Sequence, residues 1–153
     1  MIKRSTVNAL AFGASALVGI ATYEYYSSTV YIPVPGDVPT IGFGTTKGVK
    51  PGDKVTPTRA LILLLKDAEE SAQAVKRCAP VPMHQYEFDA YVSLTYNIGT
   101  NAFCKSTITK KLNAGDYDGA CKEILRWNKM GGKELNGLTK RRQSEYKTCI
   151  GIA

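Results

Sequence analysis

The chain has 153 residues, which is enough for one well-cored domain and too few for two ordinary ones. It is 44% hydrophobic and 22% charged, so we expect it to fold rather than remain disordered. The formal net charge of +7 suits a polyanionic partner, which can be nucleic acid, an anionic membrane surface or a cell-wall polymer, and charge alone does not choose among them.

The first 23 residues have the layout of an export segment. Ser5 to Tyr23 carries no charge and directly follows Lys3 and Arg4. The segment is just long enough to span a bilayer, but Ala and Gly dilute its apolar residues, so we predict marginal membrane retention with the N-terminus kept in the cytoplasm. Two other interpretations stay open: a cleaved signal peptide, with the small-residue site around Ile20, and a buried core helix.

Short strands and turns follow this segment. Residues 30–43 alternate β-branched and aromatic residues with Pro and Gly, and residues 45–53 add further turn residues. Helices come next. Thr56 is a good N-cap with Pro57 in the first turn, and we predict helices over 60–76, 85–98, 106–113, 116–127 and 140–149.

These elements predict an α+β architecture. An apolar N-terminal helix is followed by a small β lobe and then by a larger helical lobe, and the two lobes enclose a cleft. We divide the chain into an export segment, residues 1–23, and a folded domain, residues 24–153. Phe88, Tyr91, Val92 and Thr95 share one face of the 85–98 helix, which we expect to lie in the core.

The four cysteines, Cys78, Cys104, Cys121 and Cys149, are widely spaced, and the chain has one histidine. No Cys-x-x-Cys pair occurs, so we expect no metal site. In an exported protein an even number of cysteines favours two disulfides. Three pairings are possible and the spacing selects none; our working guess is Cys104–Cys121 with Cys78–Cys149. The alternative is buried free thiols.

Glu24 is the first acidic residue and lies where the apolar helix meets the β lobe. Burial there would raise the pKa of its carboxyl and keep it protonated, as a general acid requires. Asp37 and Thr40 lie in the adjacent turn and strand. The plain alternative for each isolated acid is a solvated surface group.

A longer pattern surrounds these residues. Pro39-Thr40-Ile41-Gly42-Phe43-Gly44-Thr45-Thr46 resembles the active-site region of phage-type lysozymes, in which a Glu ending the first helix precedes a Thr that opens a T-I-G-x-G motif. The resemblance continues in order through Phe88-Asp89-Ala90-Tyr91-Val92-Ser93, Asn97-Ile98-Gly99, Phe103, Ser106-Thr107, Leu112 to Tyr117, Trp127, Gly137-Leu138 and Arg141-Arg142. It covers the chain from Glu24 almost to its end.

The resemblance implies Glu24 as the general acid and Thr40 as the residue that positions the attacking water or the sugar face. The family's second carboxylate would fall near Pro33 or Val34, and neither is acidic. Asp37 is the only acid in this loop, so we assign it the second role, with a turn-forming Asp as the alternative. Asn97 and Tyr31 are assigned to substrate binding. The chain also departs from the family at Tyr25, often Gly, and at Thr45, often His.

The resemblance further implies a lysozyme-type muramidase, an endolysin that hydrolyses the β-1,4 bond between N-acetylmuramic acid and N-acetylglucosamine without a cofactor. The apolar front end is similar to that of signal-arrest-release endolysins, which implies tethering to the host inner membrane and later action in the periplasm. While the segment lay in the bilayer, the cleft would not assemble. We expect a monomer that binds peptidoglycan and no nucleic acid, since no nucleic-acid motif accompanies the charge.

Alternatives remain. The missing acid at Pro33 or Val34 and the presence of Tyr25 suggest a catalytically inactive peptidoglycan-binding protein. The apolar segment alone suggests a small pore-forming membrane protein, against which the large helix-rich remainder argues. Tyr86, Tyr91 and Tyr96 recur at near-helical spacing, which favours core packing over sugar stacking. The Lys140-Arg141-Arg142 run has the pattern of a solvated helix face, and the alternative is that it helps to attract the anionic wall. Four tyrosines have a membrane-interface alternative: Tyr23, Tyr25, Tyr26 and Tyr31.

Overall fold

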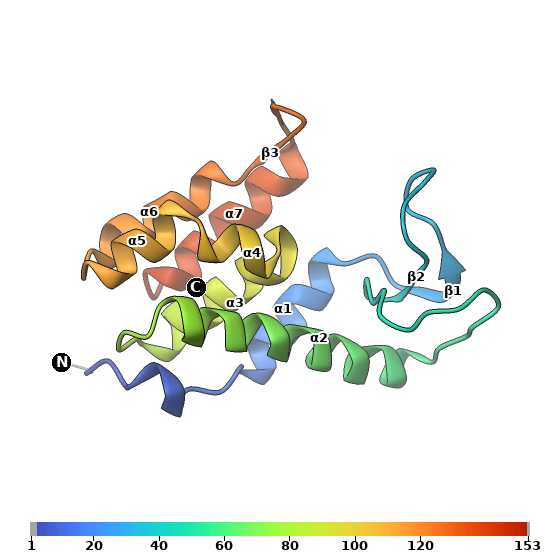
Figure 1. The fold of residues 1–153 in the computed structure, drawn as a ribbon, viewed down its shortest axis with the longest axis horizontal. Helices are drawn as coiled ribbons and strands as arrows, with labels where there is room; N and C mark the ends of the chain where they lie inside the picture. Colours follow the sequence, from blue (N-terminus) through green and yellow to red (C-terminus); the bar gives the residue numbers. More distant parts are fainter. Residues whose placement is uncertain (1–2, 153) are drawn as a thin grey trace.

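The computed structural model describes residues 3–152, and these form an α+β fold in which helices dominate. The helices are α1 (Ala14–Tyr23), α2 (Pro57–Cys78), α3 (Gln85–Ile98), α4 (Thr100–Cys104), α5 (Thr107–Asn113), α6 (Tyr117–Glu123) and α7 (Asn136–Cys149). The strands are β1 (Ser27–Tyr31), β2 (Thr40–Gly42), β3 (Lys129–Met130) and β4 (Lys133–Glu134). The β1–β2 hairpin lies at one end of the molecule and helices α3 to α7 gather at the other (Figure 1).

The β lobe is the antiparallel hairpin of β1 and β2. Ser27 lies opposite Gly42 and Tyr31 lies opposite Thr40. The connecting loop, residues 32–39, contains three prolines, which cannot donate to a sheet ladder, so both strands stay short. β2 is buried along its whole length, which sets the motif around Gly42 against the rest of the protein. The expected short strands joined by a turn are confirmed.

Helix α2 links the two lobes. It begins where predicted, because the Thr56 hydroxyl oxygen accepts a hydrogen bond from the Arg59 amide at 3.2 Å and Pro57 needs no amide partner. Its 22 residues make a rod about 33 Å long that runs from beside the hairpin to the helical lobe (Figure 1).

The main core lies in the helical lobe around α3. The four residues predicted to face the core, Phe88, Tyr91, Val92 and Thr95, are all buried. They pack with residues from the surrounding helices, among them Phe103, Ile108, Leu112 and Ile124. A smaller apolar cluster of Ile20, Leu64 and Ala68 joins α1 to α2.

The amino-terminal segment packs on the domain in this conformation. Val7 and Leu10 belong to the main core, and Ile20 of α1 is fully buried. Only residues 14–23 of the uncharged stretch are α-helical. A 3₁₀ turn at Val7–Ala9 and extended residues precede them. Among residues 3–152, no helix combines the length and the apolar content that a membrane-spanning segment requires.

Several elements differ from the sequence-based expectation. The helix predicted over 116–127 is α6, which ends at Glu123 and is followed by a 3₁₀ turn at Ile124–Arg126. The short helix α4 follows α3 directly, with Gly99 between them, and was not predicted. Strands β3 and β4 form a tight hairpin around Gly131 and Gly132, both with positive φ, where only a helix stop was expected. Helix α7 begins at Asn136, four residues earlier than predicted.

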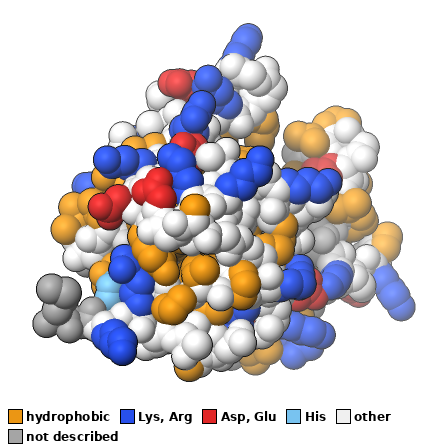
Figure 2. All heavy atoms as spheres, turned by 60° about the vertical axis from the view of Figure 1, so that its left-hand side comes forward, with side chains coloured by type: hydrophobic (Ala, Val, Ile, Leu, Met, Phe, Trp, Pro, Cys, Tyr) orange, Lys and Arg blue, Asp and Glu red, His pale blue; other side chains and the backbone are white. Residues whose placement is uncertain are grey.

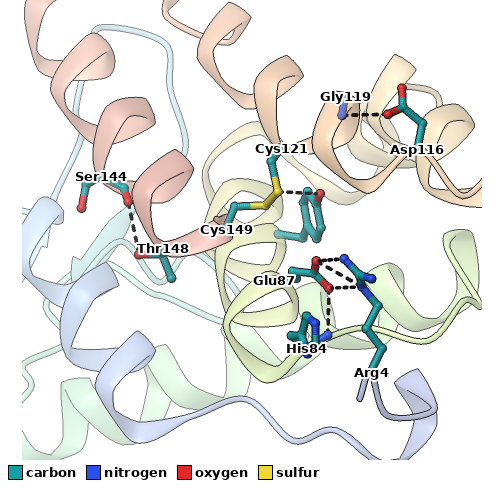
Figure 3. The surroundings of a disulfide bond; sticks show 10 residues. Arg4, His84, Glu87, Asp116, Gly119, Cys121, Ser144, Thr148 and Cys149 are labelled. Carbon is teal, nitrogen blue, oxygen red and sulfur yellow. Dashed lines mark hydrogen bonds and ion pairs between the residues drawn. A yellow bond between two sulfur atoms is a disulfide. The ribbon is translucent and has the colours of Figure 1, made fainter. Parts of the chain in front are cut away.

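All four cysteines form disulfides, but the guessed pairing is wrong. The bonds are Cys78–Cys104 and Cys121–Cys149, with Cα atoms 5.3 Å and 5.8 Å apart. The physical reason is the fold itself. Helix α4 turns the chain back so that Cys104 meets the end of α2, and α6 lies beside the last turn of α7, which brings Cys121 to Cys149 (Figure 3).

Candidate active site

A cleft of about 350 Å³ opens between the loop after β2, the middle of α2 and the carboxyl end of α3. Its lining is mostly polar and includes three carboxylates, so it suits a hydrophilic ligand. The lining residues that matter for the chemistry are Glu24, Gly44, Lys47, Asp67, Glu70, Tyr96 and Asn97. Glu24 is therefore in the cleft, where the sequence analysis placed it.

Glu24 lies immediately after α1, as its C-terminal cap residue. Its side chain is 21% exposed, and Oε1 accepts a hydrogen bond from Arg141 Nη1 at 2.9 Å. The other carboxylate oxygen lies toward Gly44. One oxygen is thus held by a cation, which leaves Oε2 to meet a ligand in the cleft.

Arg141 belongs to a buried ionic network on α7. Its Nε donates to Glu145 at 3.1 Å and its Nη2 to the Ser93 carbonyl at 3.4 Å. Arg142 is fully buried, forms an ion pair with Glu145 at 2.9 Å and donates to the Asn97 side chain. Burial lowers the pKa of the Arg142 guanidinium, an effect that the Glu145 charge opposes.

The expected solvated face at Lys140-Arg141-Arg142 is therefore wrong for the two arginines. Only Lys140 is exposed, whereas Arg141 is 4% exposed. Arg141 can be buried here because each of its three guanidinium nitrogens donates to a carboxylate or a carbonyl oxygen. Arg141 contacts Glu24 in the cleft, and sequence reasoning gave it no role in the site. The one available signal was the match of Arg141-Arg142 to the family pattern.

Gly44 is the second glycine of the T-I-G-x-G motif, and its backbone conformation shows why glycine is needed there. Its φ is +94°, a conformation that L side chains rarely adopt. A Cβ at this position would also lie 3.5 Å from Glu24 Oε2 and 3.4 Å from Tyr96 Oη. Glycine lets the loop pass close to the carboxylate without filling the cleft.

Tyr96 packs against the Ile20, Leu64 and Ala68 cluster, in line with the expected core packing, and it also lines the cleft. Its hydroxyl donates to the Phe43 carbonyl at 3.0 Å, which ties α3 to the motif loop. Burial raises the pKa of this hydroxyl, and the Glu24 and Asp67 charges raise it further. Of the other two tyrosines, Tyr91 is buried in the core as expected, whereas Tyr86 is 37% exposed.

Two further carboxylates, Asp67 and Glu70, line the cleft from α2. The Thr45 hydroxyl donates to Asp67 Oδ2 at 2.6 Å, and Lys47 forms an ion pair with Glu70. Burial raises the pKa of Asp67, while the Thr45 hydrogen bond lowers it. Sequence reasoning missed Asp67 and Glu70, although their spacing of three residues places both on one face of a helix.

The remaining predicted site residues are not all brought together. Asn97 lines the cleft, and Tyr31 lies near Glu24, whose charge adds to burial in raising the Tyr31 pKa. Thr40 is buried in β2 and is not among the residues that line the cleft, and its hydroxyl donates to the Val38 carbonyl at 3.1 Å. Asp37 lies in the exposed hairpin loop, where Oδ1 accepts from the Val38 amide at 2.8 Å, and it is not among the residues that line the cleft.

No group of three or more His, Cys, Asp or Glu side chains is placed to hold a metal ion within residues 3–152. The described cleft offers carboxylate, amide, hydroxyl and guanidinium groups to a ligand. Such a set can transfer protons and bind sugar hydroxyls.

Comparison with known proteins gives this site its context. Residues 21–145 match the family described as Phage lysozyme. The chain belongs to the phage lysozyme family. As a lysozyme-family endolysin it is a glycoside hydrolase that degrades peptidoglycan during host lysis.

Three relatives illustrate the extent of the similarity. The chain is 39% identical to an endolysin of Bacillus phage B103 over 82% of its own length and 49% of that protein, so it spans about half of that relative. It is 36% identical to the SAR-endolysin of Pseudomonas phage phiKMV over 90% of its length and 87% of the relative. The solved endolysin from Escherichia coli O157:H7 phage FAHEc1 superposes with a TM-score of 0.81 at 34% identity, covering 99% of this chain and 98% of that one.

Proposed function

We propose that this lysozyme cleaves the β-1,4 bond between N-acetylmuramic acid and N-acetylglucosamine, with Glu24 as the general acid. The observation that carries the assignment is the position of Glu24, which ends α1 inside the cleft with Oε1 bound to Arg141 and Oε2 directed toward Gly44. A proton on Oε2 would reach the leaving glycosidic oxygen of a sugar chain lying along the cleft.

The second group of the reaction is assigned to the β1–β2 loop. Asp37 is the only acid among residues 32–39, and Thr40 follows it at the start of β2. We keep Asp37 as the proposed second carboxylate and Thr40 as the residue that positions water or the sugar face. Asp37→Asn keeps an acceptor for the Val38 amide, so the turn should survive. Loss of kcat in this variant supports the role, and full kcat contradicts it.

The proposed substrate suits the charge of the protein. Figure 2 shows Lys and Arg side chains spread over the face that it draws, with fewer Asp and Glu side chains among them. With a net charge of +7, the enzyme would be attracted to the anionic wall over a distance set by ionic strength. Asn97 and Tyr31, which lie in or near the cleft, are proposed to contact the sugar. We propose that the enzyme acts as a monomer and needs no cofactor.

The decisive experiment measures reducing ends released from purified peptidoglycan. The wild-type protein should be active, and Glu24→Gln should lower the rate by a factor on the order of 100 or more, since the amide cannot donate the proton. Glu134→Gln, the same change on the exposed strand β4, is the matched control and should keep full activity. Binding of peptidoglycan without new reducing ends from the wild type would instead support a wall-binding protein.

We further propose that residues 1–23 direct export and tether the enzyme to the host inner membrane before it acts in the periplasm. The uncharged stretch after Lys3 and Arg4 supports this, as do the two disulfides and the relative named a SAR-endolysin. Fractionation of expressing cells over time should show membrane-bound protein first and soluble periplasmic protein of unchanged mass later. Protein found only in the cytoplasm would contradict the proposal.

A further inference from the structure

Two buried carboxylates on α3 have no part in the cleft. Glu87 is 3% exposed and Asp89 is 8% exposed, and neither lines the cleft that contains Glu24. A buried carboxylate is costly unless hydrogen bonds or a cation satisfy it. Both of these carboxylates find partners in the amino-terminal segment, far away in the sequence.

Glu87 binds Arg4 through a forked contact. Arg4 Nε lies 3.2 Å and 3.0 Å from the two carboxylate oxygens, and Nη2 lies 2.7 Å from Oε1. The guanidinium also lies over the Tyr117 ring, 3.7 Å from its centroid. Figure 3 shows Arg4 reaching up from the segment to Glu87, whose Oε2 also accepts from the His84 amide at 2.8 Å. Charge-assisted forked pairs of this kind fix both partners in position.

Backbone pairing continues the attachment next to this ion pair. The Ser5 and Met83 amides each donate to the other residue's carbonyl, at 2.9 Å and 2.8 Å. The segment is thus joined like a strand to the turn before α3.

Asp89 holds the start of α1. Its Oδ1 accepts from the amide of Gly13, the N-cap residue of α1, at 3.1 Å and from Gln85 Nε2 at 3.0 Å. Gln85 also donates to the Ala11 carbonyl at 2.7 Å. A Cβ on residue 13 would lie only 3.0 Å from Asp89 Oδ2, so the approach depends on glycine.

Apolar packing alone fixes α1 weakly. Of its ten residues only Ile20 is buried. A cavity of about 360 Å³ separates its Ser15, Ala16 and Gly19 side from α3 and α7. A Cβ on Gly19 would have no neighbour within 4 Å. The position of α1 therefore depends on polar contacts at its two ends as well as on the Ile20 cluster. Asp89 binds the Gly13 amide at the start, and Arg141 binds Glu24 just after the last residue.

We propose that Glu87 and Asp89 form a docking site for residues 4–13 and act as positioning residues for Glu24. The inference rests on the proposed role of Glu24. A helix of ten residues is a rod about 15 Å long, so a shift at Gly13 is carried to Glu24. Misplacement of a catalytic group by about 1 Å can cost about a hundredfold in rate. Docking of the segment on α3 thus helps to hold Glu24 in its position in the cleft.

The test uses the full purified chain and three variants of the docking site. Asp89→Ala removes the acceptor for Gly13, Asp89→Asn keeps an acceptor oxygen, and Glu87→Gln removes the charge that pairs with Arg4. The measurements are kcat and KM for reducing-end release and hydrogen exchange of the amides in residues 14–23. We expect Asp89→Ala to lower kcat at least about tenfold, with KM changed less than about twofold and with faster exchange in α1. Asp89→Asn should restore most of kcat.

Asp53→Ala is the matched control. Asp53 also accepts a hydrogen bond from a backbone amide, that of Lys50 at 2.8 Å, but in the loop before α2 and without a contact to residues 4–13. It should lower stability without changing kcat or exchange in α1. Wild-type kcat and wild-type α1 exchange in both Asp89→Ala and Glu87→Gln would overturn the docking role.

The two proposals fail differently. An inactive wild type would remove the role of Glu24, while exchange in α1 would still report whether Asp89 and Glu87 hold the segment. If Asp89→Ala speeds exchange throughout the domain, the isosteric variant Glu87→Gln decides the matter. Faster exchange confined to the segment and α1 then supports docking, and unchanged exchange there contradicts it.

Discussion

Arg141 of α7 binds Glu24 at the end of α1 across 117 positions of the sequence, with Nη1 and Oε1 2.9 Å apart. The same guanidinium contacts Glu145 and the Ser93 carbonyl. Arg141 therefore fixes the orientation of the proposed acid relative to α3 and α7, and any substitution there disturbs the site and the buried network together.

Arg141→Lys should lower kcat by about tenfold or more, because one ammonium group cannot reproduce a guanidinium that reaches three acceptors in fixed directions. The melting temperature should also fall, since Glu145 loses a buried partner. Both quantities are measured against Lys140→Ala, which removes the exposed neighbouring charge and should leave kcat unchanged. Equal kcat in Arg141→Lys and wild type would show that Glu24 needs no such partner.

Asp67 predicts a distinct pH dependence of stability. Burial raises its pKa in the folded state, so the folded protein binds this proton more tightly than the unfolded chain does. The contribution to stability is present below the unfolded pKa and is lost as pH rises through the folded pKa. The amide of Asp67→Asn cannot titrate. The free energy of unfolding of this variant minus that of wild type should therefore be larger, in the direction of a more stable variant, at pH 7 than at pH 3.

Urea unfolding at a series of pH values measures this difference directly, with Asp118→Asn on the exposed side of α6 as the control. The Thr45 hydroxyl can still donate to the new amide oxygen, so the comparison isolates the charge. A difference between wild type and Asp67→Asn that does not change with pH would contradict the effect of burial.

Local patterns were enough to predict the elements that depend on neighbours in sequence. Thr56 and Pro57 marked the start of α2, and the spacing of Phe88, Tyr91 and Val92 marked the buried face of α3. Glu24 was located because it is the first acid after an apolar helix and matches the family motif.

The rest of the site depends on contacts between distant segments, which periodicity does not encode. Arg141 and Arg142 have the pattern of a solvated charge run, and only the fold supplies the acceptors that bury them. The unpredicted helix α4 redirects the chain toward α2, and this led to the wrong disulfide pairing. Asp67 is one acid among several on α2 until the loop with Thr45 is laid against it.

The disulfide between Cys121 and Cys149 should stabilise the fold by limiting the unfolded chain. It closes a loop with a sequence separation of 28, for which loop entropy predicts about 3 to 4 kcal/mol. Replacing both cysteines by alanine should lower the free energy of unfolding by about 2 to 4 kcal/mol in urea titrations. Non-reducing peptide mapping of the wild type should recover Cys121 linked to Cys149, and a Cys104–Cys121 peptide would contradict the structure.

The cavity beside α1 predicts that Gly19 can be replaced without a clash. Gly19→Ala removes the cost of glycine within a helix and places a methyl group that meets nothing within 4 Å beyond the adjoining backbone of its own helix. Helix α1 should therefore gain about 0.5 to 1 kcal/mol of stability. Hydrogen exchange in residues 14–23 of the purified protein should slow while exchange in α3 stays the same. Gly19→Leu fills more of the cavity and should slow exchange further.

In cells the same substitutions should act in the opposite direction, if the segment resides in the membrane before release. A more apolar segment leaves the bilayer less readily, by about 0.8 kcal/mol for each added CH₂ group. Lysis should therefore start later with Gly19→Leu than with Gly19→Ala, although α1 is expected to be more stable in purified Gly19→Leu than in purified Gly19→Ala. Simultaneous lysis by both variants and wild type would separate the packing of α1 from any stay in the membrane.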